Sequence, residues 1–206
     1  MTPIDILRAN PVVAILRGVR PNEVLDVAQV LVDAGFKVIE VPLNSPEPLK
    51  SLERVASKFG PDVLVGAGTV LTAARADDCA RAGARLILSP NMNTAVIRRS
   101  VELGLVSMPG VATVSEAFNA LDAGAHALKM FPADVLGTAS LKAWRAVVPH
   151  GTAFYAVGGM DARNIRDFRM AGAAGVGLGS SLYVPGMALD ELARRARLLL
   201  AAWAVD

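Results

Sequence analysis

The sequence alternates short apolar runs, rich in β-branched residues, with longer segments of helical periodicity from one end to the other. This alternation is typical of strand–helix–strand units around a parallel sheet, because each parallel strand needs a long crossover before the next. Eight apolar runs can form strands. They are residues 12–16, 38–41, 64–66, 86–88, 105–108, 127–130, 153–156 and 175–177.

The segments between these runs have helical periodicity and begin with side chains that can cap a helix. We expect helices over residues 22–34, 46–59, 72–82, 94–103, 113–122, 138–146, 161–171 and 188–202. Eight strands are the number that closes a barrel, so we predict an α/β fold, a (β/α)8 TIM barrel, with an extra N-terminal helix over residues 2–9 across its floor. A doubly wound open sheet is the alternative. It is less favoured because no GxGxxG motif follows the first strand.

Length and composition limit the class of protein. A chain of 206 residues fits one α/β barrel, which takes roughly 200–250 residues, so we predict a single domain over residues 1–206. Its 53% of hydrophobic residues suits strands that are buried on both faces. The net charge is only +2, with both signs mixed along the chain, which argues against nucleic acid or an anionic membrane as a partner.

Cysteine and histidine content is low. Cys79 is the single cysteine, which excludes an internal disulfide, and the start of the chain shows no basic segment followed by an apolar one, so we predict a cytoplasmic location. His126 and His150 have no metal-ligand spacing with acidic residues or cysteine, so we predict neither a metal nor another cofactor.

In such barrels the functional side chains come from the carboxyl ends of the strands. Lys129 stands in the apolar sequence ALKMFP, where burial would lower the pKa of its ammonium group and favour the free amine. A neutral amine can attack a ketone to form an imine, which then serves as an electron sink for carbon–carbon cleavage. A lysine at a strand end that only pairs with a carboxylate is the alternative.

Glu40 and Arg17 also lie at strand ends. Alternation along the second strand points Glu40 to the face opposite its apolar neighbours, into the barrel, where a carboxylate can transfer protons. A buried Glu40 that merely neutralises Lys129 or Arg17 is the other possibility. Arg17, followed by Gly18, can bind an anionic end of a substrate or hold Glu40 ionised.

The remaining strand ends are rich in glycine and serine. Thr69, in GAGT, can help hold a carboxylate or make a local turn, and Pro90, in SPN, can line a pocket or turn the chain. Small residues after the last two strands favour phosphate binding by backbone N–H groups, with the start of a short helix adding a favourable dipole. They are Gly158, Gly159, Gly179 and Ser180. Two flexible turns without a ligand are the alternative.

Taken together and in order, these strand ends resemble the class I 2-keto-3-deoxy-6-phospho sugar acid aldolases. The resemblance extends from about residue 10 to residue 187, and seven motifs carry it. They are VAILRG (13–18), IEVPLNSP (39–46), GAGTVL (66–71), SPN (89–91), LKMFPA (128–133), AVGG (156–159) and GLGSSLY (177–183).

The resemblance implies roles for these residues. Lys129 is then the imine-forming residue and Glu40 the proton donor and acceptor, while Thr69 and nearby backbone hold the pyruvyl carboxylate. Substrate-binding positions within the same motifs are Arg17, Pro90, Phe131 and Val157, with Gly158, Gly159, Gly179 and Ser180 at the phosphate end. The family resemblance also implies a homotrimer.

Two positions bear on which substrate is cleaved. Phosphogluconate enzymes of this family usually carry an Arg a few residues beyond the Glu and a Thr just before the paired glycines, whereas this chain has Asn44 and Val157. Val157 cannot hydrogen-bond the C4 hydroxyl, whose configuration distinguishes the two substrates. The pattern is similar to the phosphogalactonate branch, so we expect cleavage of 2-dehydro-3-deoxy-6-phosphogalactonate to pyruvate and glyceraldehyde 3-phosphate.

Three alternatives remain at this point. One is a 2-keto-3-deoxy-6-phosphogluconate aldolase or an enzyme that accepts both C4 epimers. Another is a phosphate-binding barrel isomerase that works by acid–base chemistry without a covalent intermediate, with Lys129 as an electrostatic group. The last is a sugar-phosphate-binding protein without catalytic activity.

Overall fold

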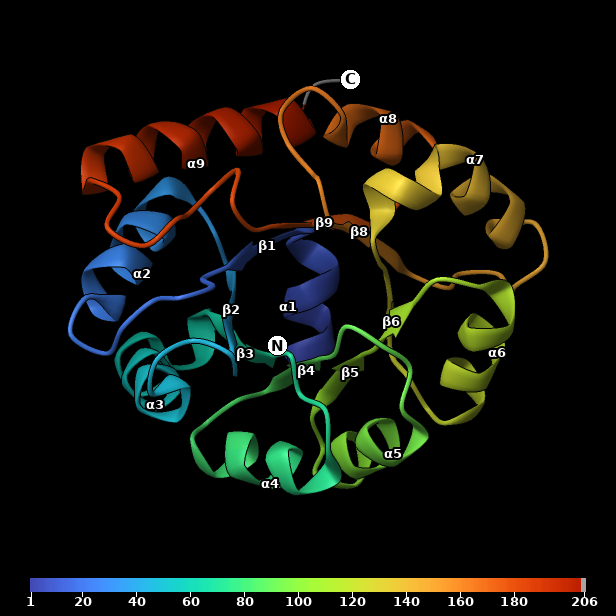
Figure 1. The fold of residues 1–206 in the computed structure, drawn as a ribbon, viewed down its shortest axis with the longest axis horizontal. Coiled ribbons are helices and arrows are strands. Elements are labelled where there is room, and N and C mark those ends of the chain that lie inside the picture. Colours follow the sequence, from blue (N-terminus) through green and yellow to red (C-terminus); the bar gives the residue numbers. More distant parts are fainter. Residues whose placement is uncertain (205–206) are drawn as a thin grey trace.

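Parallel strands form a nearly closed ring in the computed structural model, which describes residues 1–204 (Figure 1). The predicted domain of residues 1–206 therefore includes two residues that lie outside the described part. The strands found among residues 1–204 are β1 Val12–Ile15, β2 Val38–Pro42, β3 Leu64–Gly68, β4 Leu86–Leu88, β5 Val106–Met108, β6 Gly110–Val111, β7 Leu128–Met130, β8 Phe154–Val157 and β9 Gly175–Leu178.

The strands pair in the order β5-β4-β3-β2-β1-β9-β8-β7-β6. Only Pro109 separates β5 from β6 in the chain, so these two segments occupy one strand position of an eight-fold ring. Proline has no N–H for the ladder, which accounts for the break, while its carbonyl accepts a hydrogen bond of 2.9 Å from the amide of Lys129. The barrel prediction is confirmed, and the open-sheet alternative is wrong.

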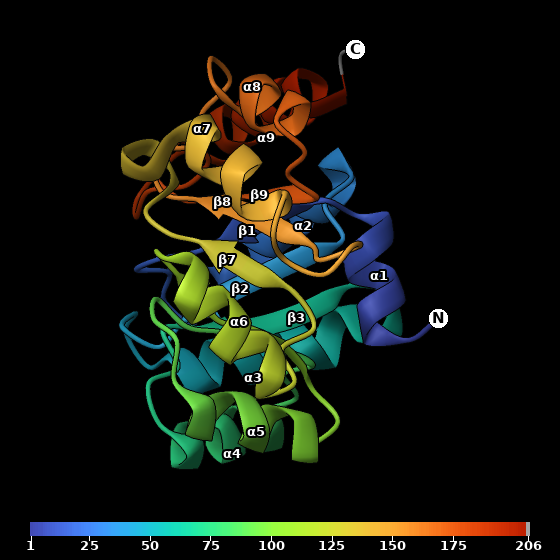
Figure 2. The ribbon, with the colours of Figure 1, turned by 90° about the vertical axis from the view of Figure 1, so that its right-hand side faces the viewer.

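Helices surround the ring, except for one that lies across its end (Figures 1 and 2). The surrounding helices are α2 Val24–Ala34, α3 Pro48–Phe59, α4 Ala73–Arg81, α5 Thr94–Glu102, α6 Val114–Asp122, α7 Ala133–Arg145, α8 Ile165–Met170 and α9 Leu189–Ala204, with a short 3-10 turn at Gly60–Asp62. Helix α1, Pro3–Ala9, covers the end, and the hydroxyl of Tyr155 donates a hydrogen bond of 2.9 Å to the carbonyl of Leu7. The predicted N-terminal helix is confirmed.

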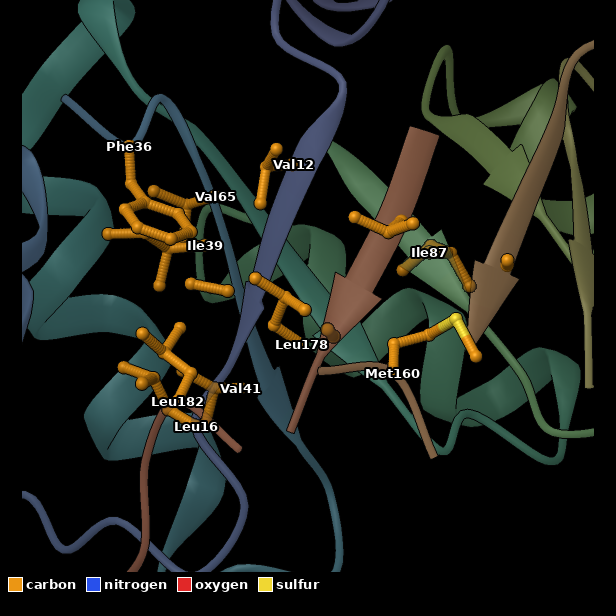
Figure 3. Close-up of a cluster of buried hydrophobic side chains, with 14 of the residues drawn as sticks. Val12, Leu16, Phe36, Ile39, Val41, Val65, Ile87, Met160, Leu178 and Leu182 are labelled. Atoms are coloured by element: carbon orange, nitrogen blue, oxygen red, sulfur yellow. The ribbon is translucent and has the colours of Figure 1, made fainter. Parts of the chain in front are cut away.

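Side chains from the strands alternate between the inside of the barrel and the layer under the helices. The floor cluster inside the barrel consists of Ile6, Leu7, Val13, Val38, Leu64, Leu86, Leu88, Val106, Met108, Ala127 and Tyr155. Neighbouring residues such as Ile39 and Val65 belong instead to the larger outer cluster between strands and helices (Figure 3). Along β2, Val38 therefore points inward and Ile39 outward, which directs Glu40 inward above the floor cluster.

Several helix starts differ from the sequence-based expectation. Thr72 and Thr113 cap α4 and α6 as expected, but Asn93, not Thr94, caps α5. Helix α7 starts at Ala133, well before Thr138, and is interrupted by the non-helical backbone of Gly137. Within residues 1–204, no helix has the length and apolar character needed to cross a membrane.

Candidate active site

The strand-end cavity lies where the carboxyl ends of β1, β7, β8 and β9 meet, and its volume is about 500 Å³. Residues from all four strand ends line it. They are Ile15, Arg17, Lys129, Phe131, Val157, Gly158, Gly159, Met160, Asp161, Arg163, Gly177, Gly179, Ser180 and Ser181. A second hollow of about 580 Å³ lies by the loops that precede β8 and β9 and contains none of the predicted site residues.

Lys129 is the buried amine of this cavity. It lies in β7, is 4% exposed, and its Nζ sits 4.8 Å from the centre of the Phe131 ring. Burial lowers the pKa of Lys129, and the nearby Arg17 lowers it further, while Glu40 acts in the opposite direction. The environment therefore favours the uncharged amine, the form that can act as a nucleophile.

Glu40 is the carboxyl group close to that amine. It is 1% exposed, and burial raises its pKa, against the smaller lowering effects of Lys129 and Arg17. Its Oε2 is buried and has no hydrogen-bond partner among the described residues. A carboxyl with a raised pKa and an unused oxygen can both give and accept a proton during a reaction.

The backbone beneath Glu40 explains why glycine stands at position 68. A Cβ added to Gly68 would lie 1.6 Å from Oε1 of Glu40, so the carboxyl group packs directly against the end of β3. Only a residue without a side chain leaves this space for the carboxyl group.

Arg17 connects the reacting pair to the loop after β2. Its Nη1 donates a hydrogen bond of 2.9 Å to Oδ1 of Asn44, and the amide of Gly18 donates one of 2.9 Å to the hydroxyl of Ser45. Arg17 is therefore held by Asn44, and it influences Glu40 through its charge. Its place on the cavity wall also leaves it available to an anionic ligand.

Thr69 and Pro90 lie at the predicted strand ends but not on the wall of the strand-end cavity. Thr69 has a φ of 57°, which is rare for a β-branched residue and costs about 1–3 kcal/mol. Backbone hydrogen bonds hold the chain on both sides of Thr69: the amide of Leu43 donates to the carbonyl of Gly68, and the amide of Val70 donates to the carbonyl of Leu88. Such strain is common at functional sites.

Pro90 is packed closely against the barrel. A Cβ added to Gly110 would lie 2.4 Å from its carbonyl carbon, so Pro90 fixes the end of β4 against β6. The structure thus gives Pro90 a packing role, and a substrate contact there stays a prediction.

Gly158 and Gly159 form the first half of the predicted phosphate end. Both have positive φ, 102° and 65°, and an added Cβ at Gly159 would lie 2.4 Å from Oδ2 of Asp134. The backbone at this turn therefore requires glycine at both positions. Because neither residue has a side chain, the backbone amides of the turn face the cavity directly.

Gly179 and Ser180 form the second half. The carbonyl of Gly179 accepts hydrogen bonds from the amides of Leu182 and Tyr183, which makes a single turn in place of the expected short helix. The first amides of such a turn have no carbonyl within it to bond, so they can donate to an anion.

Three polar residues of the cavity were not among the predicted site residues. Ser181 lines the cavity with a buried hydroxyl that has no hydrogen-bond partner among residues 1–204. Asp161 and Arg163 follow the paired glycines and pair with each other. Two of them could have been found from the sequence, because Asp161 stands where a helix cap was expected and Ser181 lies in the GLGSSLY motif.

The cavity thus combines a buried amine, an arginine and two glycine-rich turns, and a carboxyl with a raised pKa lies close enough to interact with the amine. Amine and carboxyl can form and break an imine, while the turns supply N–H donors for an anionic group. Among residues 1–204, no group of three or more His, Cys, Asp or Glu side chains is arranged to hold a metal ion.

Comparison with known proteins gives consistent matches over most of the chain. Residues 4–194 match the family model for KDPG and KHG aldolase. The chain is 44% identical to the 2-dehydro-3-deoxy-6-phosphogalactonate aldolase of Escherichia coli (strain K12), with 94% of each chain covered. A solved structure described as "Native KDPGal structure" matches with a TM-score of 0.92 at 44% identity, covering 94% of both chains.

A KDPG aldolase from Legionella pneumophila, solved with pyruvate captured at low pH as a covalent carbinolamine intermediate, is also similar. Its TM-score is 0.84 at 32% identity, and the match covers 100% of this chain and 98% of that one.

Proposed function

The chain belongs to the KDPG and KHG aldolase family, and on this basis we propose that it cleaves 2-dehydro-3-deoxy-6-phosphogalactonate through a Schiff base on Lys129. It is a carbon–carbon lyase by family, with pyruvate and glyceraldehyde 3-phosphate as the proposed products. The observation that carries the proposal is the buried amine of Lys129, 4% exposed, in the same cavity as two glycine-rich turns. The carbinolamine captured in the Legionella relative supports covalent chemistry.

In the proposed reaction, the uncharged Nζ of Lys129 attacks C2 of the substrate and forms a carbinolamine. Glu40 protonates the departing hydroxyl, and loss of water gives the iminium. Glu40, now a carboxylate, takes the C4 hydroxyl proton, and the C3–C4 bond breaks to release glyceraldehyde 3-phosphate. The electron pair of that bond moves into the iminium and gives an enamine. Protonation of the enamine at C3 and hydrolysis release pyruvate and regenerate the amine.

The other residues of the site hold the two anionic ends of the substrate. Gly158, Gly159, Gly179 and Ser180 donate to the phosphate through backbone N–H groups. Thr69 and nearby backbone hold the carboxylate next to Glu40, and Arg17 keeps the local field positive. Phe131 packs against Lys129 and excludes water from the amine.

The preference for the galactonate epimer rests on the similarity to the Escherichia coli enzyme and on Val157. The Val157 side chain lies on the cavity wall and packs directly against Gly177. A Cβ added to Gly177 would lie only 2.8 Å from Cγ2 of Val157. An apolar group there offers no hydrogen bond to the C4 hydroxyl. Val157→Thr adds a hydroxyl at nearly constant volume and should shift the preference toward the gluconate epimer.

The test is pyruvate release from the two purified C4 epimers, measured in a coupled assay. The wild-type chain should show a higher kcat/KM for the galactonate epimer, and Lys129→Ala should abolish turnover of both. Lys142→Ala, which removes an exposed lysine of α7, is the control and should keep wild-type rates. Release from neither epimer, or unchanged turnover by Lys129→Ala, would refute the proposal.

A homotrimer in the cytoplasm completes the proposal. The trimer rests on the resemblance of the sequence to this family, and exposed apolar side chains on or next to α7 and α8 are compatible with covered surface. The most exposed of these are Val135, Val147 and Met170, at 78%, 60% and 73%.

A further inference from the structure

The strand-end cavity is lined by two groups of ionisable side chains, Arg17 with Lys129 and Asp161 with Arg163. Arg17 belongs to the reacting group, because its charge lowers the pKa of both Glu40 and Lys129. Asp161 and Arg163 also line the cavity, but they contribute to neither shift and lie just after Gly158 and Gly159. The second pair therefore lies next to the proposed phosphate end, apart from the groups that shift the pKa of the amine.

Asp161 holds Arg163 through its side chain and its backbone. Nε of Arg163 donates a hydrogen bond of 3.0 Å to Oδ2 of Asp161, Nη2 donates to the same oxygen, and the amide of Arg163 donates one of 2.8 Å to Oδ1. These bonds lower the pKa of Asp161, so its carboxylate is charged. The Nη1 group of Arg163 has no partner within residues 1–204 and remains free to donate.

This arrangement matters because a phosphate monoester is close to a dianion at neutral pH. The glycine-rich turns offer only uncharged N–H groups, and the carboxylate of Asp161 alone would repel the phosphate. Arg163 cancels that charge and keeps N–H donors free on a side chain that is 90% exposed and so able to turn toward a ligand.

We propose that Arg163 is a phosphate-binding residue that makes the enzyme prefer phosphorylated over unphosphorylated 2-keto-3-deoxy sugar acids. This inference rests on the proposed function and deepens it, since it assigns a charged partner to the phosphate end. Arg163 is a specificity residue, because it lies away from the bond that breaks.

The test compares two substrates that differ only in the phosphate, 2-dehydro-3-deoxy-6-phosphogalactonate and 2-keto-3-deoxygalactonate. Arg163→Ala should raise KM for the phosphorylated substrate about 5- to 10-fold, as expected for loss of one charge-assisted contact near solvent. The kcat/KM for the unphosphorylated substrate should change less than about 2-fold, since that substrate does not reach the guanidinium. Arg163→Lys keeps the positive charge but loses the planar guanidinium with its paired N–H donors. Its KM for the phosphorylated substrate should lie between those of wild type and Arg163→Ala.

Inorganic phosphate provides a second readout that needs no phosphorylated sugar. Inorganic phosphate should inhibit cleavage of the unphosphorylated substrate competitively. Its inhibition constant should be several-fold higher for Arg163→Ala than for the wild type. Arg81→Ala removes another exposed arginine that pairs with an aspartate, on α4 away from the cavity, and should leave both readouts unchanged.

The outcomes separate the two proposals. If the wild-type chain releases pyruvate from neither substrate, the proposed function fails and this inference with it. If the wild type cleaves both and Arg163→Ala keeps the same preference for phosphate, only the role of Arg163 is refuted. A KM that rises equally for both substrates would also refute it, because that result indicates a merely structural role for the Asp161–Arg163 pair.

Discussion

Gly179 is a glycine that the fold itself does not require. Its φ lies outside the left-handed region, and an added Cβ would meet no atom within 4 Å, yet the residue lines the strand-end cavity. Space that the protein leaves open at such a position is space for a ligand. Gly158 differs, because its φ of 102° and the close approach of Pro132 at 3.1 Å demand glycine for the backbone.

Gly179→Ala should therefore separate binding from stability. We expect the free energy of unfolding to stay the same or rise by up to about 1 kcal/mol, because alanine restricts the unfolded chain. KM for the phosphorylated substrate should rise several-fold as the methyl group crowds the phosphate end. Thermal unfolding and steady-state kinetics measure the two effects, and Gly158→Ala is the matched variant that should lose stability. A destabilised Gly179→Ala with normal KM would contradict this account.

Glu40 carries a pH-dependent cost of burial. Because burial raises its pKa above 4.5, the folded protein holds the carboxyl proton more tightly than the unfolded chain does. The resulting stabilisation is complete below about pH 4.5 and is lost as the pH rises through the folded-state pKa.

Glu40→Gln removes this titration, since glutamine is neutral at every pH. Its Tm relative to wild type should increase as the pH is raised from 4 and then level off. Glu191→Gln is a control of opposite sign, because hydrogen bonds from Arg194 and Arg195 lower the pKa of Glu191 to about 2, so its stabilisation is lost as the pH falls. A difference between Glu40→Gln and wild type that does not vary with pH would show that Glu40 ionises normally.

At the scale of elements, α1 closes the barrel at the end opposite the site. It packs on the floor cluster and is attached by the hydrogen bond from Tyr155 to the Leu7 carbonyl. Tyr155→Phe should lower the free energy of unfolding by about 1 kcal/mol through the loss of this buried hydrogen bond. Denaturant unfolding measures the loss, while kcat/KM should stay at the wild-type value. A large drop in activity would mean that the floor and the site are coupled.

Most strands could be predicted from the sequence because their apolar runs are buried on both faces and contrast sharply with the helices. Every predicted strand begins within one residue of an observed one. The sequence does not predict that the fifth strand resumes at Gly110, because a proline such as Pro109 usually ends a strand. The carbonyl of Pro109 nevertheless accepts a hydrogen bond from β7. The early start of α7 was missed because Pro132 and Gly137 suggest a loop.

Site residues could be predicted where a strand end fixed their place. Lys129 and Val157 lie on cavity-lining strands, and alternation alone determines which way they point. Arg163 could not be predicted in this way, because it lies in the loop before α8, where no periodicity indicates direction. Thr69 and Pro90 follow the ends of β3 and β4, but neither lines the cavity, which a place after a strand does not reveal.

At the scale of the molecule, closure of the ring brings strand ends from both halves of the chain to one mouth. β1 lies beside β9, so Arg17 and Gly179 line the same cavity although the sequence separates them by most of its length. The pairing of β7, β8, β9 and β1 as neighbours therefore places the amine and the glycine-rich turns around one cavity, where one substrate can contact them together.

The proposed trimer is tested by light scattering coupled to size-exclusion chromatography. The account predicts a mass three times the 21.5 kDa of the chain at micromolar concentration. A particle with the mass of a single chain would contradict the trimer without affecting the proposed chemistry, because the described site residues all come from one chain.

The central claim is that the amine of Lys129 forms a covalent imine with pyruvate. Incubation with pyruvate and sodium borohydride, followed by peptide mass spectrometry, measures this directly, because only an imine is reduced to a stable adduct. We predict loss of activity together with one reduced pyruvate on the peptide that contains Lys129, and no adduct on Lys129→Ala. Full activity with no adduct, or an adduct at another lysine, would contradict the account.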